Sequence, residues 1–88
     1  MEELKKNLYL IGQTIKIYRR NLNLSQEELA FKANLDRTYI SKLEQGQMNA
    51  TIKSLTKIAN ALEINIFILI KEAENPKDLN MCKQKNIP

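Results

Sequence analysis

The stretch from Gln26 to Gln45, QEELAFKANLDRTYISKLEQ, decides the fold because it holds two short amphipathic segments separated by a tight turn. Ser25 precedes it, and Ser25 and Glu28 have the spacing of a capping box, in which each side chain bonds the other residue's backbone amide. A helix is therefore expected to begin there and to end before Asn34, a residue that tolerates the left-handed conformation of a tight turn. The expected inward-facing residues of this helix are Leu29, Ala30 and Ala33.

A second short helix is predicted from Arg37 to Glu44, with Asp36 as its amino-terminal cap and Gly46 as a left-handed stop. Its buried positions are expected to be Ile40 and Leu43. Two short helices joined by a tight turn, the second with a polar outer face, form the arrangement that lays one helix in the major groove of DNA.

Helices are also predicted on both sides of this pair. A stripe with steps of three and four residues predicts a first helix from about residue 5 to 21, ended by Asn21 to Asn23, with Asn23 as a left-handed candidate. Thr51 is expected to cap a fourth helix, and Lys53 and Lys57 lie off its stripe. The stripe of the first helix is Leu8, Ile11, Ile15, Tyr18 and Leu22, and that of the fourth is Ile52, Leu55, Ile58, Ala59 and Leu62.

The segment from Ile64 to Ile70 does not separate helix from strand by its periodicity, because six of its seven residues are apolar and four are β-branched isoleucines. A helix capped by Asn65 is favoured over a strand. The predicted organisation is one domain over residues 1–73, followed by a polar, frayed or disordered tail over residues 74–88. Met81 and Cys82 in that tail receive no role.

Composition excludes several classes of protein. A chain of 88 residues is too short for a two-domain enzyme, and with no histidine and one cysteine it offers neither a zinc site nor a nucleophile–base pair. Neither a metal nor another cofactor is therefore expected. No apolar stretch is long enough to span a bilayer, and no signal peptide begins the chain, so a cytoplasmic address is predicted. A net charge of +4 favours an anionic partner such as nucleic acid.

The helix pair resembles the Cro/C1, or XRE-type, helix-turn-helix repressors. The resemblance lies in Gln26, then Leu29 and Ala30, then the Ile40 and Leu43 spacing, then Glu44 and Gly46, and it covers residues 8 to 70. It implies an all-α fold of five helices like that of the lambda repressor. DRTYIS followed by a TIKSL helix is particularly similar to controller proteins of restriction–modification operons. Asn34 stands where the family often has glycine.

The residues at the start of the third helix are the expected readers of DNA, because a helix in the major groove points its first residues at the base edges. Arg37 is the strongest candidate, since a guanidinium donates two hydrogen bonds to guanine. The alternative is that these residues are only the solvated face of a short helix and do not contact DNA. The expected base-reading residues are Arg37, Thr38, Tyr39, Ser41 and Lys42.

Other residues are expected to position the DNA or the fold. Gln26 resembles the family glutamine that binds phosphate, and its alternative role is only to cap. A second phosphate clamp is predicted at the start of the fourth helix from Asn49, Thr51 and Lys53. The family also pairs an arginine late in the first helix with the glutamate that ends the third, which implies a structural ion pair between Arg19 and Glu44. The basic residues Lys5, Lys6, Lys16 and Arg20 are expected to be solvated surface.

A homodimer is expected because one short helix reads too few base pairs, and two-fold pairing places two half-sites about one helical turn apart. The predicted dimer interface is Ile64, Ile66, Phe67, Ile68, Leu69 and Ile70, with the monomer core as the alternative place for these residues. The chain is thus predicted to regulate transcription by binding operator DNA without a small-molecule ligand, as a restriction–modification controller. The alternatives are a prophage repressor, an antitoxin, or a protein-interaction adaptor that does not bind DNA.

Overall fold

The computed structural model describes residues 2–74, which form five α-helices and no strand. The expected all-α fold is therefore confirmed, and the helix pair lies where the sequence predicted it. The fifth helix continues through Glu74, one residue past the expected domain boundary, and the predicted tail beyond it lies outside the described residues. The helices are α1 (Glu2–Asn21), α2 (Gln26–Ala33), α3 (Arg37–Glu44), α4 (Ile52–Ala61) and α5 (Ile66–Glu74).

The helices α1 to α4 end in the same way. After each, a residue with positive φ lets two backbone N–H groups turn back to the last free carbonyls of the helix, the pattern of a Schellman motif. Asn23, Asn34 and Gly46 were expected in this conformation and adopt φ values of 59°, 56° and 74°. Glu63 adopts the same conformation at 62° after α4, a position where glycine or asparagine is usual.

The helix starts are set by local side chains in three of the four expected cases. Ser25 and Glu28 form the predicted capping box of α2, and Thr51 forms another with Ser54 at α4. The Asn65 side chain accepts from the backbone N–H of Phe67 at 2.7 Å, so α5 is the capped helix that was favoured over a strand. Asp36 precedes α3 but makes no side-chain capping bond, so its predicted role is wrong.

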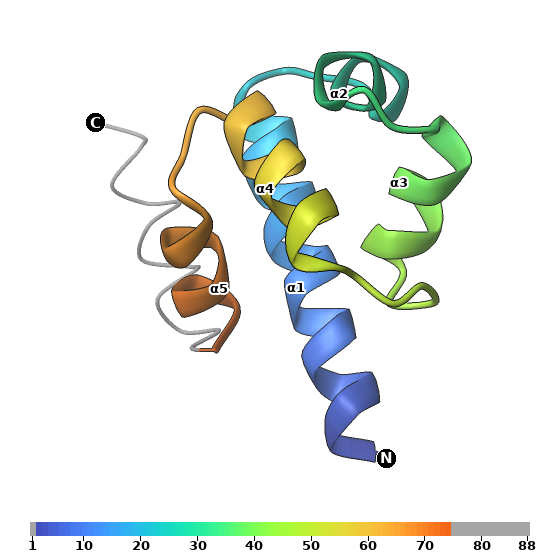
Figure 1. Ribbon diagram of the computed structural model, residues 1–88, viewed down its shortest axis with the longest axis vertical. Helices are drawn as coiled ribbons and strands as arrows, with labels where there is room; N and C mark the ends of the chain where they lie inside the picture. The colour runs from blue at the N-terminus through green and yellow to red at the C-terminus, as the bar shows by residue number, and fades with distance from the viewer. Residues whose placement is uncertain (1, 75–88) are drawn as a thin grey trace.

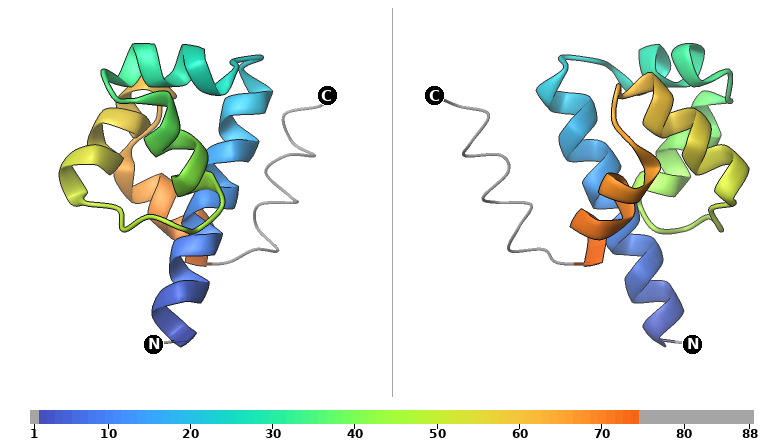
Figure 2. Two further views of the ribbon diagram at one scale, coloured as in Figure 1. Left: turned by 90° about the vertical axis from the view of Figure 1, so that its right-hand side faces the viewer. Right: turned by 60° about the vertical axis from the view of Figure 1, so that its left-hand side comes forward.

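The long helix α1 lies between α3 and α5, which lie on opposite sides of the molecule (Figure 1). The short helix α2 packs on α3 and α4, and α4 also contacts α5. The first turns of α1 extend beyond the other helices (Figure 2). The large side chains buried completely at the centre are Ile15, Leu29, Ile40, Leu43, Ile58, Leu62 and Leu69.

Two residues of the predicted apolar stripes are exposed instead. Leu22 is 41% exposed and Ile52 is 68% exposed. Leu22 follows the last residue of α1 and Ile52 is the first residue of α4, so both lie at helix ends that the neighbouring helices do not cover.

Gly12 allows α1 to approach the end of α3. A Cβ atom at this position would lie 2.2 Å from the carbonyl oxygen of Leu43 and 2.8 Å from that of Glu44. The carboxyl end of α3 is therefore placed by a close contact with the α1 backbone. Among residues 2–74, no helix combines the length and apolar character needed to cross a membrane.

Candidate nucleic-acid interface

The outer face of α3 carries four of the five predicted base-reading residues. Positions 37, 38, 41 and 42 share one side of the helix, because residues four apart lie one above the other. Arg37, Thr38 and Lys42 are exposed and Ser41 is half-buried, while the opposite face is buried in the core. This face therefore presents a guanidinium, an ammonium and two hydroxyls to the surroundings.

Tyr39 lies differently from these four residues. Its ring packs against the core, and its hydroxyl lies 2.8 Å from Ser54 Oγ and donates to the carbonyl oxygen of Asn49 at 3.2 Å. The phenol thus points from α3 toward the amino end of α4.

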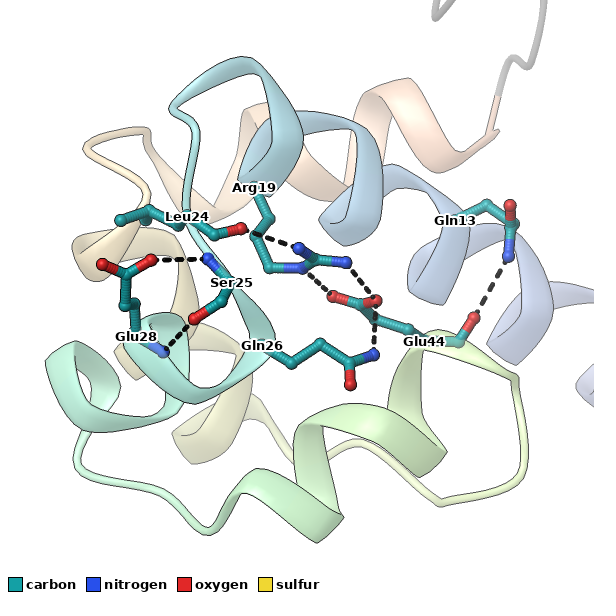
Figure 3. Close-up of polar contacts among 7 residues, drawn as sticks. All are labelled: Gln13, Arg19, Leu24, Ser25, Gln26, Glu28 and Glu44. Carbon is teal, nitrogen blue, oxygen red and sulfur yellow. Dashed lines mark hydrogen bonds and ion pairs between the residues drawn. The ribbon is translucent and has the colours of Figure 1, made fainter.

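The ion pair between Arg19 and Glu44 is present and buried (Figure 3). Arg19 Nε and Nη2 donate to the two carboxylate oxygens at 2.7 and 3.1 Å, and Nη1 donates to the carbonyl of Leu24 at 2.7 Å. Only 7% of Arg19 and 3% of Glu44 is exposed. Because removing one partner would leave the other charge buried and unpaired, replacing either residue alone is expected to destabilise the packing of α1 against α3.

Gln26 joins the same network from the first position of α2. Its Nε2 atom donates to Glu44 Oε1 at 3.1 Å, as Figure 3 shows. From α1, Gln13 donates to the backbone carbonyl of Glu44 at 3.1 Å. Glu44, at the end of α3, therefore binds groups from both α1 and α2. The amide group of Gln26 has two hydrogens, so one remains to donate to another acceptor.

The predicted phosphate clamp lies at the amino end of α4, where Asn49, Thr51 and Lys53 are all exposed. The Thr51 hydroxyl already accepts from the backbone N–H of Ser54 at 3.0 Å, so it serves the helix cap. The Asn49 carbonyl accepts from Tyr39, which links this clamp to α3.

The sequence analysis missed three residues that hold the site together: Gly12, Gln13 and Ser54. Ser54 stands three residues after the predicted cap Thr51, the position of a capping-box partner, and this spacing was an available signal. Gly12 was detectable as a glycine inside an otherwise regular amphipathic helix. Gln13 has no local signal, because its bond depends on the packing of α1 against α3.

The predicted dimer residues on and before α5 divide into two groups. Phe67, Ile68 and Ile70 are exposed by 75%, 46% and 37%. Ile64 and Ile66 are half-buried and pack on the core. Leu69 is completely buried within the monomer, so its assignment to the interface is wrong. It lies on the side of α5 that faces the rest of the bundle, where a second chain does not reach it.

A tight helix pair with an exposed polar second helix is the arrangement of the helix-turn-helix class of DNA-binding regulators. In this chain the buried ion pair between Arg19 and Glu44 supports it from behind. Residues 15–69 of this chain match the helix-turn-helix family. The chain belongs to this family, in its XRE-type branch, and is a transcriptional regulator that binds DNA.

Two relatives of different kinds are similar over most of this chain. The control protein C.BamHI of Bacillus amyloliquefaciens is 37% identical over 83 residues, which cover 86% of this chain and 90% of that protein. The immunity repressor protein of Bacillus phage phi105 is 33% identical over 81 residues, covering 88% of this chain but 56% of the repressor.

The fold is similar to that of the restriction-modification controller protein C.AhdI from Aeromonas hydrophila. The TM-score is 0.69 at 40% identity, with 70% of this chain and 94% of that one covered.

Proposed function

We propose that this chain is the controller of a restriction–modification operon, acting as a homodimer on a pseudo-palindromic operator. It acts in the cytoplasm, where the DNA lies, through its concentration and without a cofactor, a catalytic step or a small-molecule ligand. The observation that carries the proposal is the outer face of α3, which is polar and faces outward, while Ile40, Leu43 and Glu44 of the same helix are buried.

Arg37 is the main base reader in this proposal. It is the first residue of α3 and is exposed, and a guanidinium donates two hydrogen bonds to O6 and N7 of guanine. Thr38 offers a methyl group to thymine, while Ser41 and Lys42 continue the same face one turn later.

In this proposal the amino ends of α2 and α4 bind DNA phosphates on either side of the bases that α3 reads. At α2, Glu44 holds the amide group of Gln26, whose second hydrogen is free to donate to a phosphate oxygen. At α4, Lys53 and Asn49 supply the charge and the amide, while Thr51 acts through the helix end that it caps.

The dimer forms through the exposed apolar residues of α5, Phe67, Ile68 and Ile70. This helix lies on the opposite side of the monomer from α3, so pairing through it leaves both recognition helices uncovered (Figure 1).

Sequence identity favours the controller over a phage repressor. The chain is 37% identical to the control protein C.BamHI and 40% identical to the restriction-modification controller protein C.AhdI, against 33% for the phage repressor. An immunity repressor remains the second candidate, because its identity to this chain is close to that of the control protein.

Selection of genomic DNA tests the proposal. The purified protein is incubated with sheared DNA from its source at about 150 mM salt, which weakens the sequence-independent binding through phosphates, and the bound fragments are sequenced. We expect a short inverted repeat upstream of its own gene, beside methyltransferase and endonuclease genes. A site between divergent phage promoters would identify a prophage repressor, and no enrichment at any salt would favour a protein-interaction adaptor.

Replacing Arg37 by alanine tests the proposed base reader. Affinity for the selected duplex should fall by about 1 to 3 kcal/mol, or about five- to 150-fold, the value of one bidentate contact. Titration of fluorescently labelled duplex measures this loss. Arg20→Ala, which removes the same charge from an exposed position on α1, should retain most of the affinity. Equal losses in both variants would mean that Arg37 does not read a base.

A further inference from the structure

Ser54 occupies an unusual position for a small hydroxyl residue, because it contacts two helices at once. It lies in the first turn of α4, is 7% exposed, and has its Oγ atom 2.8 Å from the hydroxyl of Tyr39 on α3. The same Oγ accepts from the backbone N–H of Thr51 at 3.1 Å and donates to the Thr51 carbonyl at 3.0 Å. One oxygen thus joins the recognition helix to the cap of the next helix.

The two hydroxyls share two hydrogens among three possible hydrogen bonds, because each hydroxyl has one hydrogen. The Tyr39–Ser54 bond forms when Ser54 donates to Tyr39 and Tyr39 donates to the Asn49 carbonyl, or when Tyr39 donates to Ser54 and Ser54 donates to the Thr51 carbonyl. It is absent when both hydroxyls donate to the carbonyls. The 2.8 Å between the two hydroxyl oxygens is the shortest of the three distances and favours the arrangements in which they are bonded. In each of these the phenol hydrogen is used within the protein.

We infer that Ser54 is a positioning residue that, through Tyr39, fixes the distance between the base-reading face of α3 and the phosphate clamp at α4. This inference rests on the proposed function. Discrimination between DNA sequences requires base and phosphate contacts to form together, since phosphate contacts set the register in which bases are read. A loosened link therefore lowers the affinity for the operator more than the affinity for other DNA. It also changes the role of Tyr39, because the phenol hydrogen is used within the protein and is not available to donate to a DNA phosphate.

The first test is a comparison of four proteins on two DNA duplexes. Tyr39→Phe, Ser54→Ala, the double variant and the unaltered protein are titrated with the duplex obtained by genomic selection and with a scrambled duplex. Each single change should lower the ratio of the two affinities by about two- to tenfold, the value of one neutral hydrogen bond. The double variant should lose no more than the larger single loss, because both changes break the same link.

Thr56→Ala is the matched control. Thr56 also lies on α4, and its hydroxyl donates only to the backbone of its own helix, at the carbonyl of Ile52. This variant should leave the affinity ratio unchanged. Additive losses in the double variant, or equal losses on both duplexes, would overturn the inference and reduce Ser54 to a helix cap.

A second measurement uses the protein without DNA. The backbone N–H groups of Gly46 and Gln47, which bond the carbonyls of Leu43 and Lys42, report on the loop between α3 and α4 by amide hydrogen exchange. Exchange should be faster at both in Tyr39→Phe, which leaves the cap of α4 intact, and in Ser54→Ala, with no change in α1. Unchanged exchange would show that Ser54 holds nothing through Tyr39. If exchange is faster in both variants but the unaltered protein binds neither duplex, the link between the helices is present and the proposed function has failed.

Discussion

Single residues control how closely these helices approach one another. Gly12 is buried in α1 and faces the last two carbonyls of α3, which cannot move without disturbing Glu44. Glu63 is an exposed residue in a conformation that costs an L-amino acid about 1 to 2 kcal/mol. The site of Gly12 therefore has no room for a Cβ atom. Glu63, in contrast, carries a side chain at a position whose left-handed backbone favours glycine.

Gly12→Ala should destabilise the protein. The added Cβ would lie 2.2 Å from a backbone oxygen, and overpacking of this kind costs about 1 to 3 kcal/mol or more. This exceeds the gain of about 1 kcal/mol from replacing a glycine within a helix. The thermal midpoint should therefore fall in a circular dichroism melt. Asn7→Ala, at an exposed position of the same helix, should not lower it. A Gly12→Ala midpoint at or above that of the unaltered protein would contradict the close contact.

Glu63→Gly should stabilise the protein by up to about 1 kcal/mol, because glycine adopts the left-handed conformation without strain and loses only part of this gain to chain entropy. Glu63→Ala removes the same charge and keeps the strain, so it should show no such gain. Chemical denaturation of the three proteins measures the difference. Equal stability of the glycine and alanine variants would mean that the backbone at this position is not strained.

At the scale of the element, each helix is bounded mainly by hydrogen bonds between residues close in the chain. The amino end of α2 is the clearest case: Ser25 Oγ accepts from the N–H of Glu28 at 3.0 Å, and the Glu28 carboxylate accepts from the N–H of Ser25 at 2.8 Å. The backbone hydrogen bond from Ser25 is the largest cause that lowers the pKa of Glu28 below its ordinary value of 4.5. The bond to the Ser25 side chain lowers it further.

This shift predicts how the stability of α2 depends on pH. A carboxyl group whose pKa is lower in the folded state stabilises that state above its ordinary pKa, and the effect is lost as the pH falls through the lowered value. The difference in thermal midpoint between the unaltered protein and Glu28→Gln should therefore be largest near pH 7 and shrink as the pH falls below about 4.5. Glu27→Gln, in the same helical turn, is the matched control and should show a smaller dependence. Identical profiles for the two variants would exclude the capping box as the cause.

At the scale of the whole molecule, the monomer has two distinct faces. One carries α3 with its polar residues, and the opposite one carries α5 with Phe67, Ile68 and Ile70 exposed (Figure 1). The proposed two-fold dimer through α5 would double the DNA surface that the protein reads and would bury apolar area that a monomer leaves in water. Dimerisation and specific binding are therefore expected to be coupled.

Phe67→Asp should separate the dimer. Sedimentation should give a monomer at concentrations where the unaltered protein is a dimer, and affinity for the selected inverted repeat should fall with it. The thermal midpoint measured for the monomer should change little, because 75% of this side chain is already exposed. Phe31→Asp makes the same change at an 87% exposed phenylalanine on α2, so it should remain dimeric. A dimeric Phe67→Asp protein would place the interface elsewhere.

The sequence by itself determined the helices and most of their ends. The cap at Ser25, the left-handed residues Asn23 and Asn34 and the cap at Asn65 could all be predicted, because each depends on hydrogen bonds between residues a few positions apart. The polar face of α3 was also predictable, since the spacing along one helix defines it.

Only the tertiary structure decided which side chains are available at the site. Gln26 is held by Glu44, 18 positions away, and the hydroxyl of Tyr39 is used by Ser54, 15 positions away. Leu69 was predicted at an interface but is buried in the core, because that side of α5 packs on the rest of the bundle. These outcomes depend on how whole helices pack, and local periodicity carries no information about the partner that a side chain meets across the core.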